Sequence, residues 1–306
     1  MSGTGRHLIV LVHGYMGSTF GMRDLAAALQ RPDTLVHVAT FAGDDSQLSL
    51  LATADGIEFG GRRLATEIRR VVAMHSLSRI SLVGVSLGGV YCRWLAHELA
   101  DLRAGTIAGL RPHVFISVAS PHLGVAHSLN SVHQAAAVAA SYVGERTAWQ
   151  LLGRDEYAQL AQLTSPAALA AWNLFARRYL FANLVNDTRV DYCSAALLRA
   201  PHQALHDEAA VDDLEREVVG VYDVLDYQGD RTYPPYATGA QLEDKQLAML
   251  DAIRASELRF TNIDLRLDKS WFSRQFAHII PLGLFSRWWG GHGAESMQRI
   301  VQCLVE

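Results

Sequence analysis

The apolar residues of this chain fall in short, nearly continuous runs, and the stretches between them carry apolar residues at helical spacing. Runs of this kind are typical of parallel strands that are buried on both faces of a sheet. We expect such strands at residues 7–12, 34–40, 79–85, 113–119, 179–185 and 258–267. We expect helices at residues 25–29, 56–75, 87–99 and 294–304. The alternation predicts an α/β fold, with a mostly parallel central sheet flanked by helices.

Residues 124–178 interrupt this alternation. The stretch is rich in alanine, has helical spacing and contains no strand candidate. We expect a single domain over residues 1–306, in which 124–178 form a helical cap; the alternative is a set of extra helices on the core. The apolar side chains of the stretch would suit an acyl chain, and core packing explains any one of them equally well: Trp149, Leu151, Leu152, Trp172 and Phe175.

Composition excludes several classes of function. Half of the residues are apolar and 19% are charged, which favours a large core over disorder. The formal net charge of −4 leaves no electrostatic footprint for nucleic acid or for an anionic membrane. No apolar run reaches the roughly 20 residues that span a bilayer, and the run at 7–14 lacks the features of a signal peptide. We therefore expect a cytoplasmic protein without a transmembrane segment.

The three cysteines lie far apart, at Cys92, Cys193 and Cys303. An odd number without paired spacing indicates reduced thiols rather than a disulfide framework or a zinc site.

The pattern G-x-S-x-G at residues 84–88 provides a candidate nucleophile, Ser86. Five residues of this kind arise often by chance, but here they fall between an expected strand and an expected helix, as the motif requires. The turn is tight and strained, so the residues two positions before and after the serine must have almost no side chain. The alternative is a glycine-rich turn with an incidental serine, which that context makes less favoured.

A hydroxyl nucleophile needs a base, and the base needs a group that orients it. Asp187 follows the expected strand 179–185, at the end of the strand where α/β sheets carry functional residues. Asp191 competes with it but lies further into the loop. The non-catalytic interpretation of Asp187 is a helix cap or an Asx-turn.

Two histidines near the end of the chain are candidates for the base. His292 lies in a glycine-rich loop just before the final helix, and spacing slightly favours it. His278 is flanked by apolar residues and could instead be a hydrogen-bonded histidine of the core. The residues alone do not separate these two. For an oxyanion hole we expect the backbone N–H of Leu87 and that of Tyr15, which lies in the loop after the first strand.

Several longer stretches resemble the ROG1-like serine esterases (the DUF676 group) of the α/β-hydrolases. These stretches follow in order along nearly the whole chain: LIVLVHGYMGS at 8–18, TADGIEFGGRRLATEI at 53–68, ISLVGVSLGGVYCR at 80–93, FISVASPHLG at 115–124, FANLVNDTRVDYCSAAL at 181–197 and FSRQFAHIIPLG at 272–283. Two parts of these stretches, TADGIEFGGRRLA at 53–65 and SVASPHLG at 117–124, are far more specific to the group than the serine motif is.

The resemblance implies an α/β-hydrolase fold and a carboxylesterase or lipase that acts on acyl esters without a cofactor or a metal. It also favours His278 as the base, because the family histidine is an Ala-His followed by an apolar stretch, with Ser86 and Asp187 completing the triad. The expected partner is a small or lipid ester, with peripheral contact to a membrane or lipid droplet. Trp288 and Trp289 could contact such a lipid surface, or form a buried pair.

Two other functions remain open at this point. An acyltransferase would use the same triad and pass the acyl group to an alcohol instead of water. A catalytically silent scaffold would use the fold for binding only, although candidates for all three catalytic roles argue against it.

Overall fold

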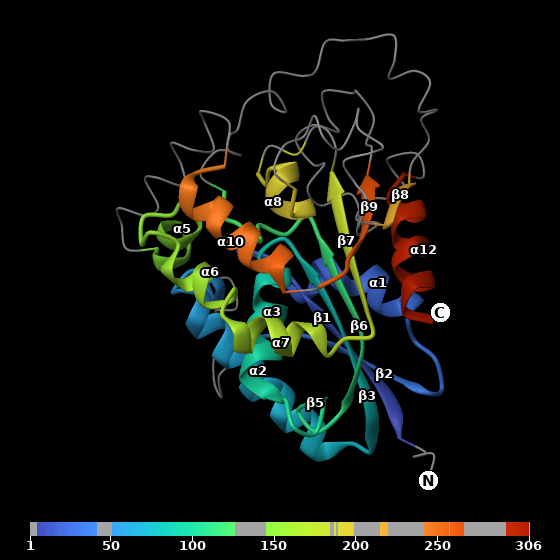
Figure 1. Cartoon of the computed structure of the whole chain (residues 1–306). Coiled ribbons are helices and arrows are strands. Elements are labelled where there is room, and N and C mark those ends of the chain that lie inside the picture. Colours follow the sequence, from blue (N-terminus) through green and yellow to red (C-terminus); the bar gives the residue numbers. More distant parts are fainter. Residues whose placement is uncertain are drawn as a thin grey trace.

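A seven-stranded sheet forms the centre of the molecule (Figure 1). The computed structural model describes residues 5–41, 51–125, 145–183, 187, 189–198, 215–219, 242–256, 258–265 and 292–305. All six pairs of neighbouring strands in this sheet are parallel. The order across the sheet is β2 (Thr34–Val38), β1 (Arg6–Val12), β3 (Leu77–Val85), β6 (Arg111–Val118), β7 (Arg177–Asn183), β9 (Thr261–Leu265) and β8 (Glu215–Val219). The predicted parallel sheet is therefore confirmed.

Six of these strands were expected from the sequence, with ends that differ by a few residues. The seventh strand, β8, was not predicted. Its sequence Glu-Arg-Glu-Val-Val has three charged residues, so it lacks the apolar run that marks a strand buried on both faces. Among the described strands it lies at an edge of the sheet, next to β9. Edge strands often carry charged residues, because these discourage pairing with another chain.

Four of the helices were expected: α1 (Arg23–Ala28), α2 (Ile57–Met74), α3 (Leu87–Leu99) and α12 (His292–Val305). Two more, α8 (Tyr192–Ala196) and α10 (Asp244–Ala255), were not. A signal for α10 was present, because Glu243 and Gln246 form a capping box at its start. The remaining elements are short: the 3-10 helices η1 (Thr19–Met22) and η2 (Leu51–Thr53), and a hairpin of β4 (Ala100–Asp101) and β5 (Thr106–Ile107).

The sheet separates two hydrophobic clusters, because successive side chains of a strand point to opposite faces. Along β1, Leu8 and Val10 belong to the larger cluster, whereas Ile9 and Leu11 belong to the smaller one. Helices α2, α3, α7 and α10 contribute to the larger cluster, and α1 and α12 contribute to the smaller one. Helices therefore cover both faces of the sheet, as the alternation of elements predicted.

The described part of the expected cap consists of α5 (Arg146–Leu151), α6 (Ala158–Gln162) and α7 (Pro166–Asn173). Helix α5 packs against α2, and α7 packs against α3, on the same side of the sheet. Trp172 of α7 is buried, with its ring 5.2 Å from that of Phe115 in β6. That side chain therefore belongs to the core. Residues 126–144 lie outside the described residues, and closure of 124–178 over a site stays a prediction.

All three cysteines are buried and free. Within the described ranges, no helix combines the length and the apolar character needed to cross a bilayer.

Candidate active site

Ser86 occupies the turn between β3 and α3, where the sequence placed it. Its φ of 55° and ψ of −130° lie in a region that residues with a side chain rarely adopt. The Ser86 N–H donates a hydrogen bond of 2.8 Å to the carbonyl of Val118, which ends β6. This strained serine is therefore held directly against the carboxyl end of the neighbouring strand, as expected for a nucleophile that must be presented at a sheet edge.

Two glycines around Ser86 are required by close backbone contacts. A Cβ atom at Gly84 would lie 2.4 Å from the carbonyl carbon of Gly88. A Cβ atom at Gly88 would lie 2.1 Å from the carbonyl oxygen of Val12, the last residue of β1. Both distances are far below van der Waals contact, and the atoms met are backbone atoms that cannot turn aside. The spacing of the motif therefore follows from the packing of α3 onto β1 and β3.

The loop after β1 lies directly beside Ser86. A Cβ atom at Gly14 would lie 2.7 Å from the Cβ and 3.2 Å from the Oγ of Ser86. Tyr15 is the next residue of this loop, and Leu87 begins α3. The first N–H groups of a helix have no partner within the helix. The two expected oxyanion donors therefore belong to segments that adjoin the serine.

His13 supports the loop after β1, a role that was not assigned from the sequence. Its Nδ1 lies 3.0 Å from the carbonyl oxygen of Gly14, so Nδ1 must carry the proton. Burial lowers the pKa of His13. The ring packs edge-on against Phe41, with 5.0 Å between centroids. The neutral imidazole thus acts as a hydrogen-bond donor to the loop, and the His-Gly pair at the end of the first strand was the signal that could have identified it.

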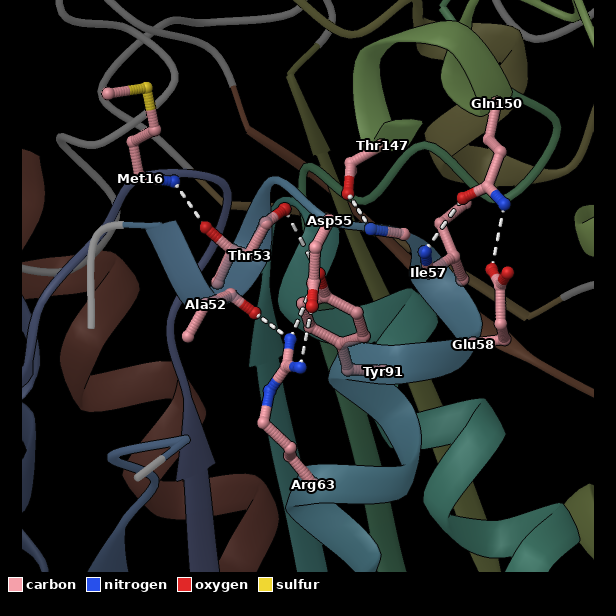
Figure 2. Close-up of polar contacts among 11 residues, drawn as sticks. Met16, Ala52, Thr53, Asp55, Ile57, Glu58, Arg63, Tyr91, Thr147 and Gln150 are labelled. Carbon is pink, nitrogen blue, oxygen red and sulfur yellow. Dashed lines mark hydrogen bonds and ion pairs between the residues drawn. The ribbon is translucent and has the colours of Figure 1, made fainter. Parts of the chain in front are cut away.

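The stretch 53–65, one of the two that are more specific to the resembled family than the serine motif, surrounds the start of α2 (Figure 2). Arg63 donates to both carboxylate oxygens of Asp55, at 2.7 and 2.6 Å, and also to the carbonyl of Ala52. Such bidentate ion pairs fix the relative orientation of the two side chains. The segment before α2 is therefore fastened to the helix that follows it.

Side chains of helix α5 bind the first turn of α2 (Figure 2). The Thr147 hydroxyl accepts the Gly56 N–H at 2.9 Å, and the Gln150 carbonyl oxygen accepts the Ile57 N–H at 2.7 Å. The Gln150 amide group also donates to Glu58 at 2.7 Å. These side chains satisfy N–H groups that the helix itself leaves unpaired.

The other specific stretch, SVASPHLG at 117–124, covers the end of β6 and the buried segment that follows it. His122 is fully buried, with Nε2 at 2.9 Å from the Ser117 hydroxyl, and burial keeps its pKa well below the usual value. Arg93 of α3 donates to the carbonyl of Leu163 at 2.8 Å and lies over the ring of Trp172 at 4.4 Å. Burial lowers the pKa of Arg93 to about 9. These contacts join α3 to α7 and indicate a structural role.

Asp187 lies four residues beyond the end of β7. Its Oδ1 accepts the N–H groups of Arg189 and Val190, at 2.9 and 3.0 Å, and its Oδ2 accepts the side-chain amide of Asn183 at 2.9 Å. The two backbone contacts are those of an Asx-turn, which was the alternative interpretation. Because parallel strands end at one edge of the sheet, Asp187 and Ser86 are on the same edge. Its catalytic role stays a prediction.

Asp191, the competing carboxylate, caps α8. Its side chain accepts the Cys193 N–H at 2.7 Å, and the residue is buried. Burial raises the pKa of Asp191. These are the contacts of an ordinary helix cap.

The candidates for the base are not placed by the structure. His278 lies outside the described residues. His292 is the first residue of α12, but its side chain is likewise outside them. The choice between these histidines stays a prediction. In the part of the chain that the structure describes, no three His, Cys, Asp or Glu side chains are grouped so that they could hold a metal ion.

Comparison with known proteins places the chain in a family. The family described as "Putative serine esterase (DUF676)" matches residues 2–198. Two Saccharomyces cerevisiae proteins are similar: "Putative lipase ROG1", 26% identical over 204 residues, and "Putative lipase YDL109C", 28% identical over 203 residues. Each alignment covers 63% of this chain, but only 29% and 30% of those relatives. The chain therefore spans less than a third of the length of the relatives it matches.

Among solved structures, the thioesterase RedJ from Streptomyces coelicolor covers 99% of this chain and 91% of its own, at 15% identity and a TM-score of 0.44. A likeness at that level does not bear on function. The parallel sheet with helices on both faces and the serine between β3 and α3 form an α/β-hydrolase fold. Because the family match extends over more than half of the chain, this protein belongs to the DUF676 family of serine esterases.

Proposed function

We propose that this protein hydrolyses carboxylic esters through Ser86, His278 and Asp187. The observation that carries the proposal is the conformation of Ser86, which is held at a positive φ between β3 and α3, with the Gly14 backbone against its side chain. Strain of this kind is retained where it serves to expose a reactive group. Family membership supports the same class of reaction.

The proposed reaction has two halves. In the first, His278 takes the Ser86 hydroxyl proton while Oγ attacks the ester carbonyl, and the same proton then leaves with the alcohol. An acyl group remains on Ser86. In the second half, water gives a proton to His278 while the water oxygen attacks the acyl carbonyl. The carboxylic acid then leaves as the bond to Oγ breaks, and His278 returns the proton to Ser86 Oγ. Asp187 orients the imidazole throughout, and the N–H groups of Tyr15 and Leu87 stabilise the oxyanion of each tetrahedral intermediate.

We further propose lipid acyl esters as the preferred substrates. The names of the two yeast relatives describe lipases, which supports this choice. Residues 124–178 would then form the cap that receives the acyl chain. A cytoplasmic enzyme that contacts a membrane or lipid-droplet surface from outside would meet such esters. Activity on p-nitrophenyl esters of increasing chain length and on emulsified acylglycerols tests the preference for lipid esters. A preference for the acetyl ester in both kinds of substrate contradicts it.

Steady-state hydrolysis of p-nitrophenyl butyrate tests the reaction itself. We expect activity from the full chain, a loss of about 10⁴-fold or more in Ser86→Ala, and a large loss in Asp187→Asn. Asp191→Asn is the matched control, because its carboxylate caps a helix instead. The proposal fails if Ser86→Ala retains the activity, and the choice of acid fails if Asp191→Asn is the inactive variant.

The same assay decides the base. We expect His278→Ala to be almost inactive and His292→Ala to keep most of its activity. The reverse result would transfer the role of base to His292.

A further inference from the structure

The two expected oxyanion donors lie on different elements, and Thr53 joins those elements through two hydrogen bonds. The Leu87 N–H lies at the start of α3, whereas the Tyr15 N–H lies in the loop after β1. Tyr91, about one helical turn beyond Leu87, donates its hydroxyl to the Thr53 carbonyl at 3.3 Å. The Thr53 hydroxyl accepts the Met16 N–H at 2.8 Å (Figure 2). A continuous path therefore leads from the nucleophile's helix to the loop.

The loop that Thr53 contacts is a strained β-turn. The Gly17 N–H donates to the Gly14 carbonyl at 3.0 Å, which closes the turn, and Met16 in its third position has a φ of 49°. A left-handed conformation is unfavourable for a residue with a side chain. Rotating the peptide between Tyr15 and Met16 would relieve that cost, but it would turn the Met16 N–H away from its acceptor. The Thr53 hydroxyl therefore opposes the relaxation of the turn.

Thr53 is itself held in a fixed place. The residue is fully buried, and so is Tyr91, whose ring lies against the start of α2. A Cβ atom at Gly60 would lie 2.5 Å from that ring, so glycine is what allows the ring to approach. Two residues beyond Thr53, Asp55 is bound by the guanidinium of Arg63. Because the position of Thr53 is fixed in this way, the hydrogen bond to its hydroxyl restrains the Met16 N–H and the turn that contains it.

We propose that Thr53 is a positioning residue for the oxyanion hole. By accepting the Met16 N–H and the Tyr91 hydroxyl, it tethers the turn that carries the Tyr15 N–H to the helix that begins at Leu87, and so sets the spacing between the two donors. This inference rests on the proposed function, because it assigns a role to Thr53 in the same ester hydrolysis. Donors of an oxyanion hole act on the transition state more than on the bound ester. Misplacing one of them therefore lowers kcat and leaves KM nearly unchanged.

Three variants of the full chain test the proposal. Thr53→Val keeps the shape and removes the acceptor, Thr53→Ser keeps the hydroxyl, and Thr66→Val is the control, since the exposed Thr66 on α2 only donates to the carbonyl of Arg62. With p-nitrophenyl butyrate we expect Thr53→Val to lose about 10- to 100-fold in kcat with KM within about twofold. We expect Thr53→Ser to recover most of the loss and Thr66→Val to equal wild type.

Affinity for an alkyl trifluoromethyl ketone provides a second readout, because its adduct with a serine carries an oxyanion. We expect the affinity of Thr53→Val for this inhibitor to fall by about the same factor as kcat/KM. The two quantities fall together only if the variant binds the transition state less tightly. A general loss of folded protein would lower the amount of active enzyme but leave the inhibition constant unchanged.

The proposal is overturned if folded Thr53→Val has wild-type kcat, if KM rises as much as kcat falls, or if Thr53→Ser fails to rescue. If Thr53→Val does not fold, Thr53→Ala decides by the same criteria. Failure of the proposed function gives a different result: either wild type has no esterase activity, or Ser86→Ala retains the wild-type activity. In that case the role of Thr53 falls with the reaction.

Discussion

At the scale of single residues, backbone contacts explain why the serine motif needs its glycines. Gly88 passes so close to the end of β1 that a single added carbon would overlap the Val12 carbonyl. Gly105, in the turn between β4 and β5, offers a contrast, because its φ is +66° but a Cβ atom there would meet nothing within 4 Å. An added side chain would thus destabilise the fold through steric overlap at Gly88, but only through the left-handed backbone conformation at Gly105.

We therefore expect Gly88→Ala to destabilise the protein by several kcal/mol, because two backbone segments must move apart. Gly105→Ala should cost only about 1–2 kcal/mol, the price of a left-handed residue. Thermal or urea unfolding of the two variants measures the difference. Equal losses of stability in both variants would show that α3 is not packed onto β1 as closely as described.

A second residue-scale prediction concerns the buried cation of α3. Arg93→Lys keeps a positive charge, but a lysine ammonium cannot reproduce the planar contact with Trp172 together with the bond to the Leu163 carbonyl. We expect a loss of about 2–4 kcal/mol in the free energy of unfolding. Arg103→Lys, at an exposed position, should change it by less than about 0.5 kcal/mol. Wild-type stability in Arg93→Lys would contradict this account of the α3–α7 contact.

At the scale of elements, α2 holds the loop that follows β2. The carboxylate of Glu67 accepts the N–H groups of Thr40 and Phe41, both at 2.9 Å, and the His37 ring nitrogen at 2.7 Å. Burial by itself raises the pKa of Glu67, but the hydrogen bonds from His37 and Thr40 outweigh it, so that the net pKa is lowered. A carboxylate whose pKa is lowered by folding stabilises the folded state in its charged form.

The sign of the pH dependence follows from that lowered pKa. The contribution of Glu67 is present in full above the pKa of the unfolded chain, about 4.3, and is lost as the pH falls through the lower folded value. We expect Glu67→Gln to cost about 1–3 kcal/mol near pH 7 and clearly less at the lowest pH where the fold survives. Urea unfolding at several pH values measures this.

Glu98→Gln is the matched control for Glu67→Gln. Glu98 is exposed and forms an ion pair with Arg69 at 3.6 Å, so its loss should change stability by less than about 1 kcal/mol. A penalty for Glu67→Gln that does not vary with pH would contradict the assignment, since it would arise from shape rather than from charge.

At the scale of the whole molecule, the sequence predicted the sheet best where strands are buried on both faces. Strands such as β1 and β3 show continuous apolar runs for that reason. The edge strand β8 was missed because charged residues replace that run. Helix α10 was missed although Glu243 and Gln246 cap its start, because a capping box that begins with glutamate departs from the usual serine or threonine pattern.

The candidate site divides in the same way. Ser86 could be predicted because its environment is local: a strand, a tight turn and a helix that follow one another in the chain. The role of Thr53 could not, because it depends on a contact made across the fold, the bond from Met16 to a residue 37 positions away. The role of His13 rests on the carbonyl of the adjacent Gly14, and the His-Gly pair was a signal for it that the sequence interpretation did not use. Asp187 is placed at the expected edge of the sheet by the end of β7, whereas His278 lies outside the described residues.

The central claim is that Ser86 is the nucleophile of an ester hydrolase. Labelling the full chain with a fluorophosphonate, followed by mass spectrometry of the peptide that contains Ser86, tests this claim most directly. We predict a single phosphonylated serine at position 86 in wild type and no labelling in Ser86→Ala, with Ser194→Ala labelled as wild type. An unlabelled wild type, or equal labelling of Ser86→Ala, would contradict the account.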